Sequence, residues 1–113
     1  MASFIYNGQG QNIGRFDGNF IYHYNGSLAG RLTGNHVYND AGSMIGRIDG
    51  KYFYDGNGHL IGRTDGHLIY DGSGGFAGRL DNNYLYDGHG RLIGRTDGLD
   101  SFKTIIYFFY FYL

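Results

Sequence analysis

Residues 52–67 read YFYDGNGHLIGRTDGH, and this stretch is one unit of a repeat that determines the fold. A tyrosine recurs every sixteen residues without a gap, at Tyr6, Tyr22, Tyr38, Tyr54, Tyr70 and Tyr86. A Gly-Arg dipeptide recurs at the same spacing, at Gly14-Arg15, Gly30-Arg31, Gly46-Arg47, Gly62-Arg63, Gly78-Arg79 and Gly94-Arg95. A period that never slips indicates one supersecondary unit copied around or along an axis.

Each unit contains two short segments with the composition of β-strands. In the fourth copy these are residues 52–55 and 59–64, which are rich in aromatic and β-branched residues and are bounded by glycine. Asp65-Gly66 lies between two such segments and predicts a two-residue type I′ hairpin turn. We therefore expect an all-β domain with about twelve short antiparallel strands.

The period divides residues 1–113 into a single repeat domain with a different C-terminal end. The predicted repeats are residues 4–19, 20–35, 36–51, 52–67, 68–83 and 84–99, followed by an aromatic segment at residues 102–113. A chain with 22 Gly would be suspected of disorder, but 12 Tyr and 9 Phe provide enough apolar surface to fold.

The predicted turn also predicts which side chains share a face of the hairpin. A turn at Asp65-Gly66 pairs Thr64 with His67. The face predicted to line the centre then carries Leu60, Gly62 and Ile69, and the opposite face carries Ile61, Arg63, Leu68 and Tyr70. Glycine at the Gly62 position would let the backbone approach whatever fills the centre.

The recurrent arginine has two interpretations. Arg63 could stack on a tyrosine ring and pair with Asp65, which is ordinary packing for a guanidinium group. Alternatively, six arginines could form a ring that holds an anion or a sugar acid. We favour packing, because six copies at one position follow from repetition itself.

No motif predicts catalysis, a metal site or a cofactor. Asp55, Asp71 and Asp87 lie in glycine-rich loops, with Asn7 and Asn39 at the same repeat position. A calcium site needs six to eight oxygen ligands, and one carboxylate per loop is better explained as turn chemistry. The five histidines do not recur at one repeat position, and there is no cysteine. We therefore expect a protein that is not an enzyme.

The C-terminal segment breaks the repeat. Residues 104–113 contain no charge and no glycine, and the segment is too short for a transmembrane helix of about twenty residues. A segment that is apolar on all sides must be buried on all sides. Its aromatic and β-branched composition favours an extended conformation over a helix.

Ring closure offers a place for this segment. Eight strands form a barrel that their own side chains just fill, so a twelve-stranded ring needs a further filler. We predict a closed, pseudo-symmetric ring of about six antiparallel hairpins around the C-terminal segment. The residues predicted to form this central plug are Ile105, Ile106, Tyr107, Phe108, Phe109, Tyr110, Phe111 and Tyr112.

Charge and the N-terminal residues limit the choice of partner and location. The formal net charge is −1, which argues against nucleic acid as a partner and leaves little repulsion to oppose self-association. Residues 1–8 have no basic region and no apolar core, so we expect no signal peptide. With no transmembrane helix expected either, the cytoplasm is the default location.

The repeat resembles the β-flower proteins, which are small bacterial proteins built from hairpin repeats and often ending in an aromatic run. The residues that carry the resemblance are 60–72, their copies, and Tyr107-Phe108-Phe109-Tyr110-Phe111. The resemblance implies a ring of hairpin petals, of which the family has four or five, whereas this chain has six repeats. It transfers no catalytic residues.

These observations favour a non-enzymatic structural or protein-interaction module, in which homo-oligomers or stacked assemblies are one form. A carbohydrate-binding repeat protein is an alternative, because aromatic residues beside Asp and Asn suit sugars. A membrane-active protein that inserts its aromatic tail is a third hypothesis.

Overall fold

The computed structural model describes residues 2–112, which form twelve strands followed by a short helical segment. The strands are β1 (Ala2–Asn7), β2 (Asn12–Asp17), β3 (Phe20–His23), β4 (Leu28–Thr33), β5 (His36–Asn39), β6 (Met44–Asp49), β7 (Tyr52–Asp55), β8 (Leu60–Asp65), β9 (Leu68–Asp71), β10 (Phe76–Asp81), β11 (Tyr84–Asp87) and β12 (Leu92–Asp97). The helical segment consists of α1 (Ser101–Tyr107) and the π-helical turn η1 (Phe108–Tyr112).

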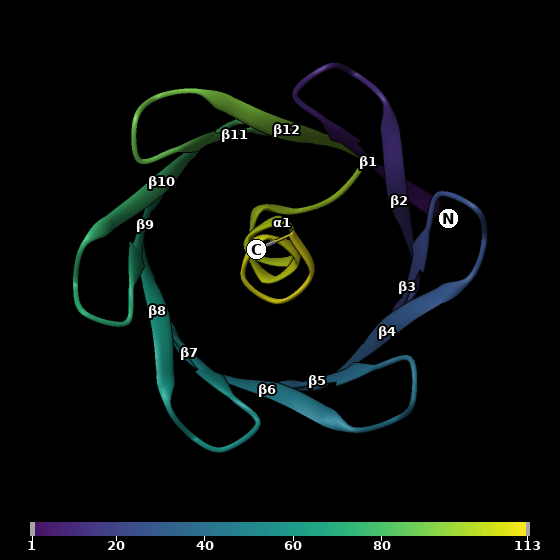
Figure 1. Cartoon of the computed structure of the whole chain (residues 1–113), viewed down its shortest axis with the longest axis horizontal. Coiled ribbons are helices and arrows are strands. Elements are labelled where there is room, and N and C mark those ends of the chain that lie inside the picture. Colours follow the sequence, from purple (N-terminus) through teal and green to yellow (C-terminus); the bar gives the residue numbers. More distant parts are fainter. Residues whose placement is uncertain (1, 113) are drawn as a thin grey trace.

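The strands form one closed antiparallel ring in sequence order (Figure 1). Each strand pairs with its neighbours in the chain, and β1 pairs with β12, so that Phe4 lies opposite Asp97 and Tyr6 opposite Arg95. The molecule is a disc of 34 × 32 × 18 Å. The predicted all-β closed ring of six antiparallel hairpins is confirmed.

The hairpin turns lie one residue later than predicted. In the fourth repeat Asp65 pairs with Leu68, so the turn consists of Gly66 and His67. Only the first of these two residues has a positive φ, +62° at Gly66, which is the pattern of a type II′ turn and not of type I′. Asn82 occupies the corresponding position of the fifth turn with φ 56°. The aspartate therefore ends the strand and does not form the turn.

The shifted turn leaves the predicted faces of β8 and β9 unchanged, but a bulge places two residues on the opposite face from the one predicted. Between β7 and β8, Tyr54 pairs with Leu60 and Phe53 with Gly62, so Ile61 is an extra residue on β8. Leu60 was predicted to line the centre but is 40% exposed on the outside. Ile61 was predicted on the opposite face but packs against the core. A bulge of this kind changes which side chains point inward on one strand only.

Two columns of buried side chains line the inside of the ring. One column is Ile5, Ile21, Val37, Phe53, Ile69 and Leu85, all at most 6% exposed. The other contains Phe16, Leu32, Ile48, Leu80 and Thr96, which the predicted register did not identify. In the observed register Thr64 lies directly opposite Ile69, so both columns face inward. Side chains alternate between the two faces along a strand, so the residue two positions after each repeat glycine, such as Thr64 after Gly62, faces inward as well. This alternation would have located the second column from the sequence.

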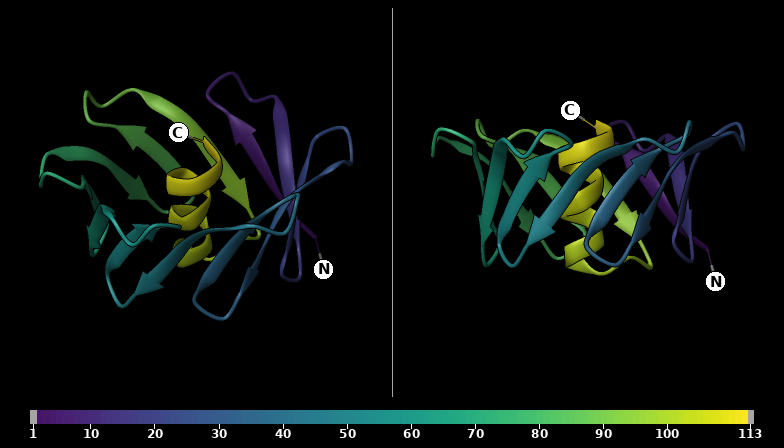
Figure 2. Two further views of the ribbon diagram at one scale, coloured as in Figure 1. Left: turned by 60° about the horizontal axis from the view of Figure 1, so that its bottom comes forward. Right: turned by 90° about the horizontal axis from the view of Figure 1, so that it is seen from below.

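The C-terminal segment is helical and runs through the middle of the ring (Figure 1, Figure 2). The predicted extended conformation is wrong. A strand in the centre of a closed ring would have no neighbouring strand to bond its backbone, whereas a helix bonds its own N–H and C=O groups. Within residues 2–112, no helix is long and apolar enough to cross a membrane.

Hydrogen bonds connect the start of this helix to the ring. The Asp100 carboxylate accepts the Lys103 N–H at 2.7 Å and caps the helix N-terminus. Inside the ring, the Thr96 and Thr104 hydroxyls lie 3.0 Å apart and share a buried hydrogen bond. The Ser3 hydroxyl donates to the Gly98 carbonyl at 2.8 Å. The helix is therefore anchored beside the pairing of β1 with β12.

Ile106 and Phe102 offer a matched test of how much the helix contributes to stability. Ile106 is 0% exposed and Phe102 is 44% exposed. We expect Ile106→Ala to lower the free energy of unfolding by about 2–5 kcal/mol, because the cavity it leaves is closed on all sides. Phe102→Ala should change it by less than about 0.5 kcal/mol. Urea unfolding followed by circular dichroism measures both, and equal effects would contradict burial of the helix.

Candidate functional site

Six arginine–tyrosine pairs recur on the outside of the ring. Each guanidinium carbon lies 4.0–4.3 Å from the centre of a tyrosine ring. The pairs are Arg15–Tyr22, Arg31–Tyr38, Arg47–Tyr54, Arg63–Tyr70, Arg79–Tyr86 and Arg95–Tyr6. The last pair joins β12 to β1 and so spans the closure of the ring.

The strand register positions these pairs. Arg63 lies directly opposite Tyr70 in its own hairpin and opposite Tyr52 of the preceding strand. A cation over an aromatic ring contributes about 0.5–1 kcal/mol at exposed sites. An ion pair between an arginine and the aspartate two residues later forms at Arg79, whose guanidinium group lies 3.6 Å from the Asp81 carboxylate. The arginines therefore pack on tyrosines along the outer face and do not converge on one point.

Large apolar side chains flank the arginine–tyrosine pairs on the same outer face. They occupy two repeat positions and are each 38–48% exposed. One position provides Phe4, Phe20, Tyr52, Leu68 and Tyr84, and the other provides Met44, Leu60, Phe76 and Leu92. We call these nine residues the outer belt. Because they recur around the ring, the belt surrounds the molecule.

The wider loops are built around a single Asx side chain each. In the loop after β9, one Asp71 carboxylate oxygen accepts the Ser73 N–H at 3.0 Å and the Gly75 N–H at 2.8 Å. Asn7 and Asn39 make the equivalent bonds in their loops. Across the described residues 2–112, no three His, Cys, Asp or Glu side chains cluster in a way that could hold a metal ion.

These hydrogen bonds stabilise the ionised form of the loop aspartates. The Ser73 hydroxyl and the Gly75 N–H hold the pKa of Asp71 below its usual value of 3.8. Backbone N–H groups lower the pKa of Asp55 and Asp87 in the same way. A lowered folded-state pKa contributes stability that is present above about pH 4 and is lost as the pH falls through the folded-state value.

Asp71→Asn should therefore remove part of the acid sensitivity and keep the loop. Asn7 and Asn39 show that the amide makes the same loop bonds. We expect the variant to melt near the wild-type temperature at pH 7 and to lose less stability than the wild type between pH 4 and pH 2. Asp71→Ala, which loses the bonds, should melt lower at both pH values. If the melting temperatures of the wild type and of Asp71→Asn fell by the same amount between pH 4 and pH 2, the lowered pKa of Asp71 would not be a source of the acid sensitivity.

The aromatic residues of the helical segment face different repeats in turn. Added at the repeat glycines, a Cβ would meet the ring of Phe111 at Gly30, of Tyr110 at Gly46 and of Phe109 at Gly62. Tyr107 faces Gly14. The Tyr110 hydroxyl donates to the carbonyl of Tyr54 at 2.7 Å. Successive aromatic residues thus pack against successive hairpins, which explains why the segment has no polar face.

The predicted plug residues have the following placement. Ile105, Ile106, Phe108 and Phe109 are buried, while Tyr107, Tyr110 and Phe111 are partly buried. Tyr112 lies in η1, and its side chain and Leu113 fall outside the described part of the chain.

The repeat glycines also approach the neighbouring strand, because a Cβ at Gly94 would lie 2.5 Å from the Tyr6 carbonyl oxygen.

Burial makes Tyr110 sensitive to alkaline pH. It raises the pKa of Tyr110 from 10.0 to about 12. A raised folded-state pKa contributes stability that is fully present below pH 10 and is lost as the pH rises towards 12. We expect Tyr110→Phe to be less stable than the wild type at pH 8, because it loses the hydroxyl bond, but to lose less further stability between pH 10 and 12. Urea titrations across this range measure how the free energy of unfolding of the wild type and of Tyr110→Phe falls with pH. An equal fall in both proteins would contradict the prediction.

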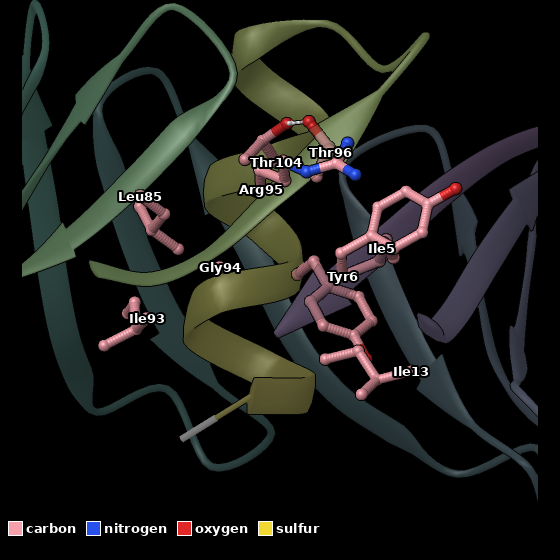
Figure 3. Close-up of a pocket in the computed structure, with 10 residues that line it drawn as sticks. Ile5, Tyr6, Ile13, Leu85, Ile93, Gly94, Arg95, Thr96 and Thr104 are labelled. Atoms are coloured by element: carbon pink, nitrogen blue, oxygen red, sulfur yellow. Dashed lines mark hydrogen bonds between the residues drawn. The ribbon is translucent and has the colours of Figure 1, made fainter. Parts of the chain in front are cut away.

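One helix cannot contact six repeats equally, and a small cavity results on one side. It lies beside Tyr107 and the β1–β12 pairing, and measures about 20 Å³ (Figure 3). Its apolar lining includes Ile5, Ile13, Leu85 and Ile93. This volume holds about one water molecule. The cavity therefore provides no room for a substrate at this position, beside the packed helix and inner columns.

Comparison with known proteins gives one family match, which agrees with the β-hairpin ring but differs in its symmetry. The family model described as "5-fold beta-flower protein" matches residues 2–113. No curated protein and no solved structure matches the chain. The family description gives five-fold symmetry, whereas the twelve strands of this ring form six hairpin units. With residues 2–113 matched, the chain belongs to the β-flower family.

Proposed function

We propose that the protein is a non-enzymatic interaction module that assembles with other copies of itself through the outer belt. The observation that carries the proposal is the exposure of nine large apolar side chains at two repeat positions, each 38–48% exposed. Large apolar side chains exposed in this number on one face are typical of protein–protein contacts. A closed ring has no free strand edges in the sheet, so side chains and not backbone groups would make the contact.

The charge distribution supports contact between identical surfaces. Each arginine of the belt region is stacked on a tyrosine, and exposed aspartates such as Asp65 and Asp81 follow it on the same strands. Five of the six arginines thus have an aspartate two residues later, Arg31 being followed by Thr33, and the net charge of −1 adds little repulsion between copies. Tyrosine and arginine are also the residues that contribute most at protein interfaces.

The position of the C-terminal segment favours this role over membrane insertion. Ile105, Ile106, Phe108 and Phe109 are buried in the ring and hold the strands around them. Their release to a lipid surface would empty the core of the molecule. The filled centre likewise favours a role for the outside of the ring.

The oligomeric state in solution tests the proposal. We expect the molar mass from size-exclusion chromatography with light scattering to rise with protein concentration. Replacing Phe20, Tyr52, Leu68 and Tyr84 together by threonine, which keeps β propensity, should shift the protein to a monomer with an unchanged circular dichroism spectrum. A control with threonine at the turn residues Lys51 and His67 should associate like the wild type. A wild-type monomer at all concentrations would refute the proposal.

A further inference from the structure

Several positions on β2, on β3 and in the second loop, which joins β3 to β4, depart from the repeat and lie together in space. Asn12 stands where the other five repeats have Leu28, Met44, Leu60, Phe76 and Leu92. His23 stands where the other loops have Asn or Asp, and Tyr24 where four of them have glycine. The repeated fold forms without these three residues in the other repeats. Their presence together at one place on the ring therefore points to a role that is specific to that place.

These exceptions line two adjoining recesses on the surface. One has a volume of about 160 Å³ and is lined by Phe4, Asn12, Gly14, Arg15, His23 and Tyr24. The other has a volume of about 370 Å³ and is lined by Gln11, Asn12, Ile13 and Tyr24. Asn12 and Tyr24 border both. The shorter Asn12 side chain leaves space where the other repeats have a larger apolar residue.

The second loop does not use the side chain of His23 or Tyr24 for its own hydrogen bonds. In the second loop, Asn25 replaces the usual Asx residue and accepts the Ser27 N–H at 3.0 Å and the Ser27 hydroxyl at 2.7 Å. The side chains of Asn12, His23 and Tyr24 make no hydrogen bond to any described residue, and Tyr24 is 75% exposed. Their polar groups are therefore available to a ligand.

The chemistry of the lining identifies the class of ligand. Tyr24 and Phe4 provide aromatic surface for the apolar face of a sugar ring. Asn12 and His23 can both donate and accept hydrogen bonds, as sugar hydroxyls require. Arg15, stacked on Tyr22 at 4.3 Å, can donate two parallel hydrogen bonds to a carboxylate.

Charge distinguishes this place from the corresponding positions of three other repeats. No acidic residue lines either recess. At the equivalent position beside Arg47, Arg63 and Arg79, the loop contributes Asp55, Asp71 or Asp87. A carboxylate ligand would be repelled there, whereas at the second loop it meets Arg15 and His23.

We propose that the recess between Phe4, Asn12, Arg15, His23 and Tyr24 binds an acidic sugar, with the uronic acid carboxylate on Arg15 and the ring against Tyr24. This site is independent of assembly through the outer belt, with which it shares only Phe4.

Binding of defined oligosaccharides tests the site. The probe is a glucuronic acid oligosaccharide, with a glucose oligosaccharide of the same length as the neutral match, and binding is followed by amide chemical-shift changes and calorimetry. We expect shifts confined to residues around Asn12 and Tyr24, and binding of the neutral probe at least about tenfold weaker. Absence of binding, or equal affinity for both probes, would overturn the proposal.

Variants that restore the repeat provide the second part of the test. Asn12→Leu on β2 and Tyr24→Gly in the second loop each introduce the residue that the fourth repeat has at that position, so both should fold. Together they should weaken binding of the acidic probe at least about tenfold. Leu60→Asn, which makes the Asn12 change in the fourth repeat, should bind like the wild type. Unchanged affinity in the double variant would overturn the proposal.

Discussion

Pairing of β1 with β12 is the constraint on which the rest of the structure depends. It joins the two ends of the repeat array and converts a sheet with two free edges into a ring with none. The sixth arginine–tyrosine pair, Arg95 with Tyr6, spans this junction at 4.0 Å, and the helix is anchored beside it through Thr96 and Thr104. Closure, the outer stacking and the attachment of the helix therefore meet at one place.

Closure with twelve strands creates an interior that the inward-facing side chains of the ring do not fill, and the C-terminal segment occupies it. Because hairpins surround it on every side, each aromatic residue finds an apolar surface, and an amphipathic helix would not fit. The helix has no six-fold symmetry. Phe109, Tyr110 and Phe111 contact three successive repeats, while the small cavity remains near Tyr107.

On the outside of the ring, most side chains follow the sixteen-residue repeat and a few depart from it. Repetition produces six stacked arginines and a belt of exposed apolar residues, which supports contact with further copies of the chain. The exceptions Asn12, His23 and Tyr24 produce one recess of different shape and charge. They are visible in the sequence as departures from the period, but they lie on two different strands and a loop. Only the ring brings them together with Phe4 and Arg15.

The sequence by itself determined the strands, the closed ring and the inner column around Ile69, because an unbroken period of sixteen residues leaves one repeated hairpin as the solution. It could not decide the register or the bulge. Moving the turn by one residue changes the pairing partners and keeps the faces, whereas the bulge at Ile61 exchanges the faces of Leu60 and Ile61 without changing the composition. It also could not decide that residues 101–112 are helical. Their β propensity is a local preference, and the absence of a strand partner at the centre of the ring overrides it.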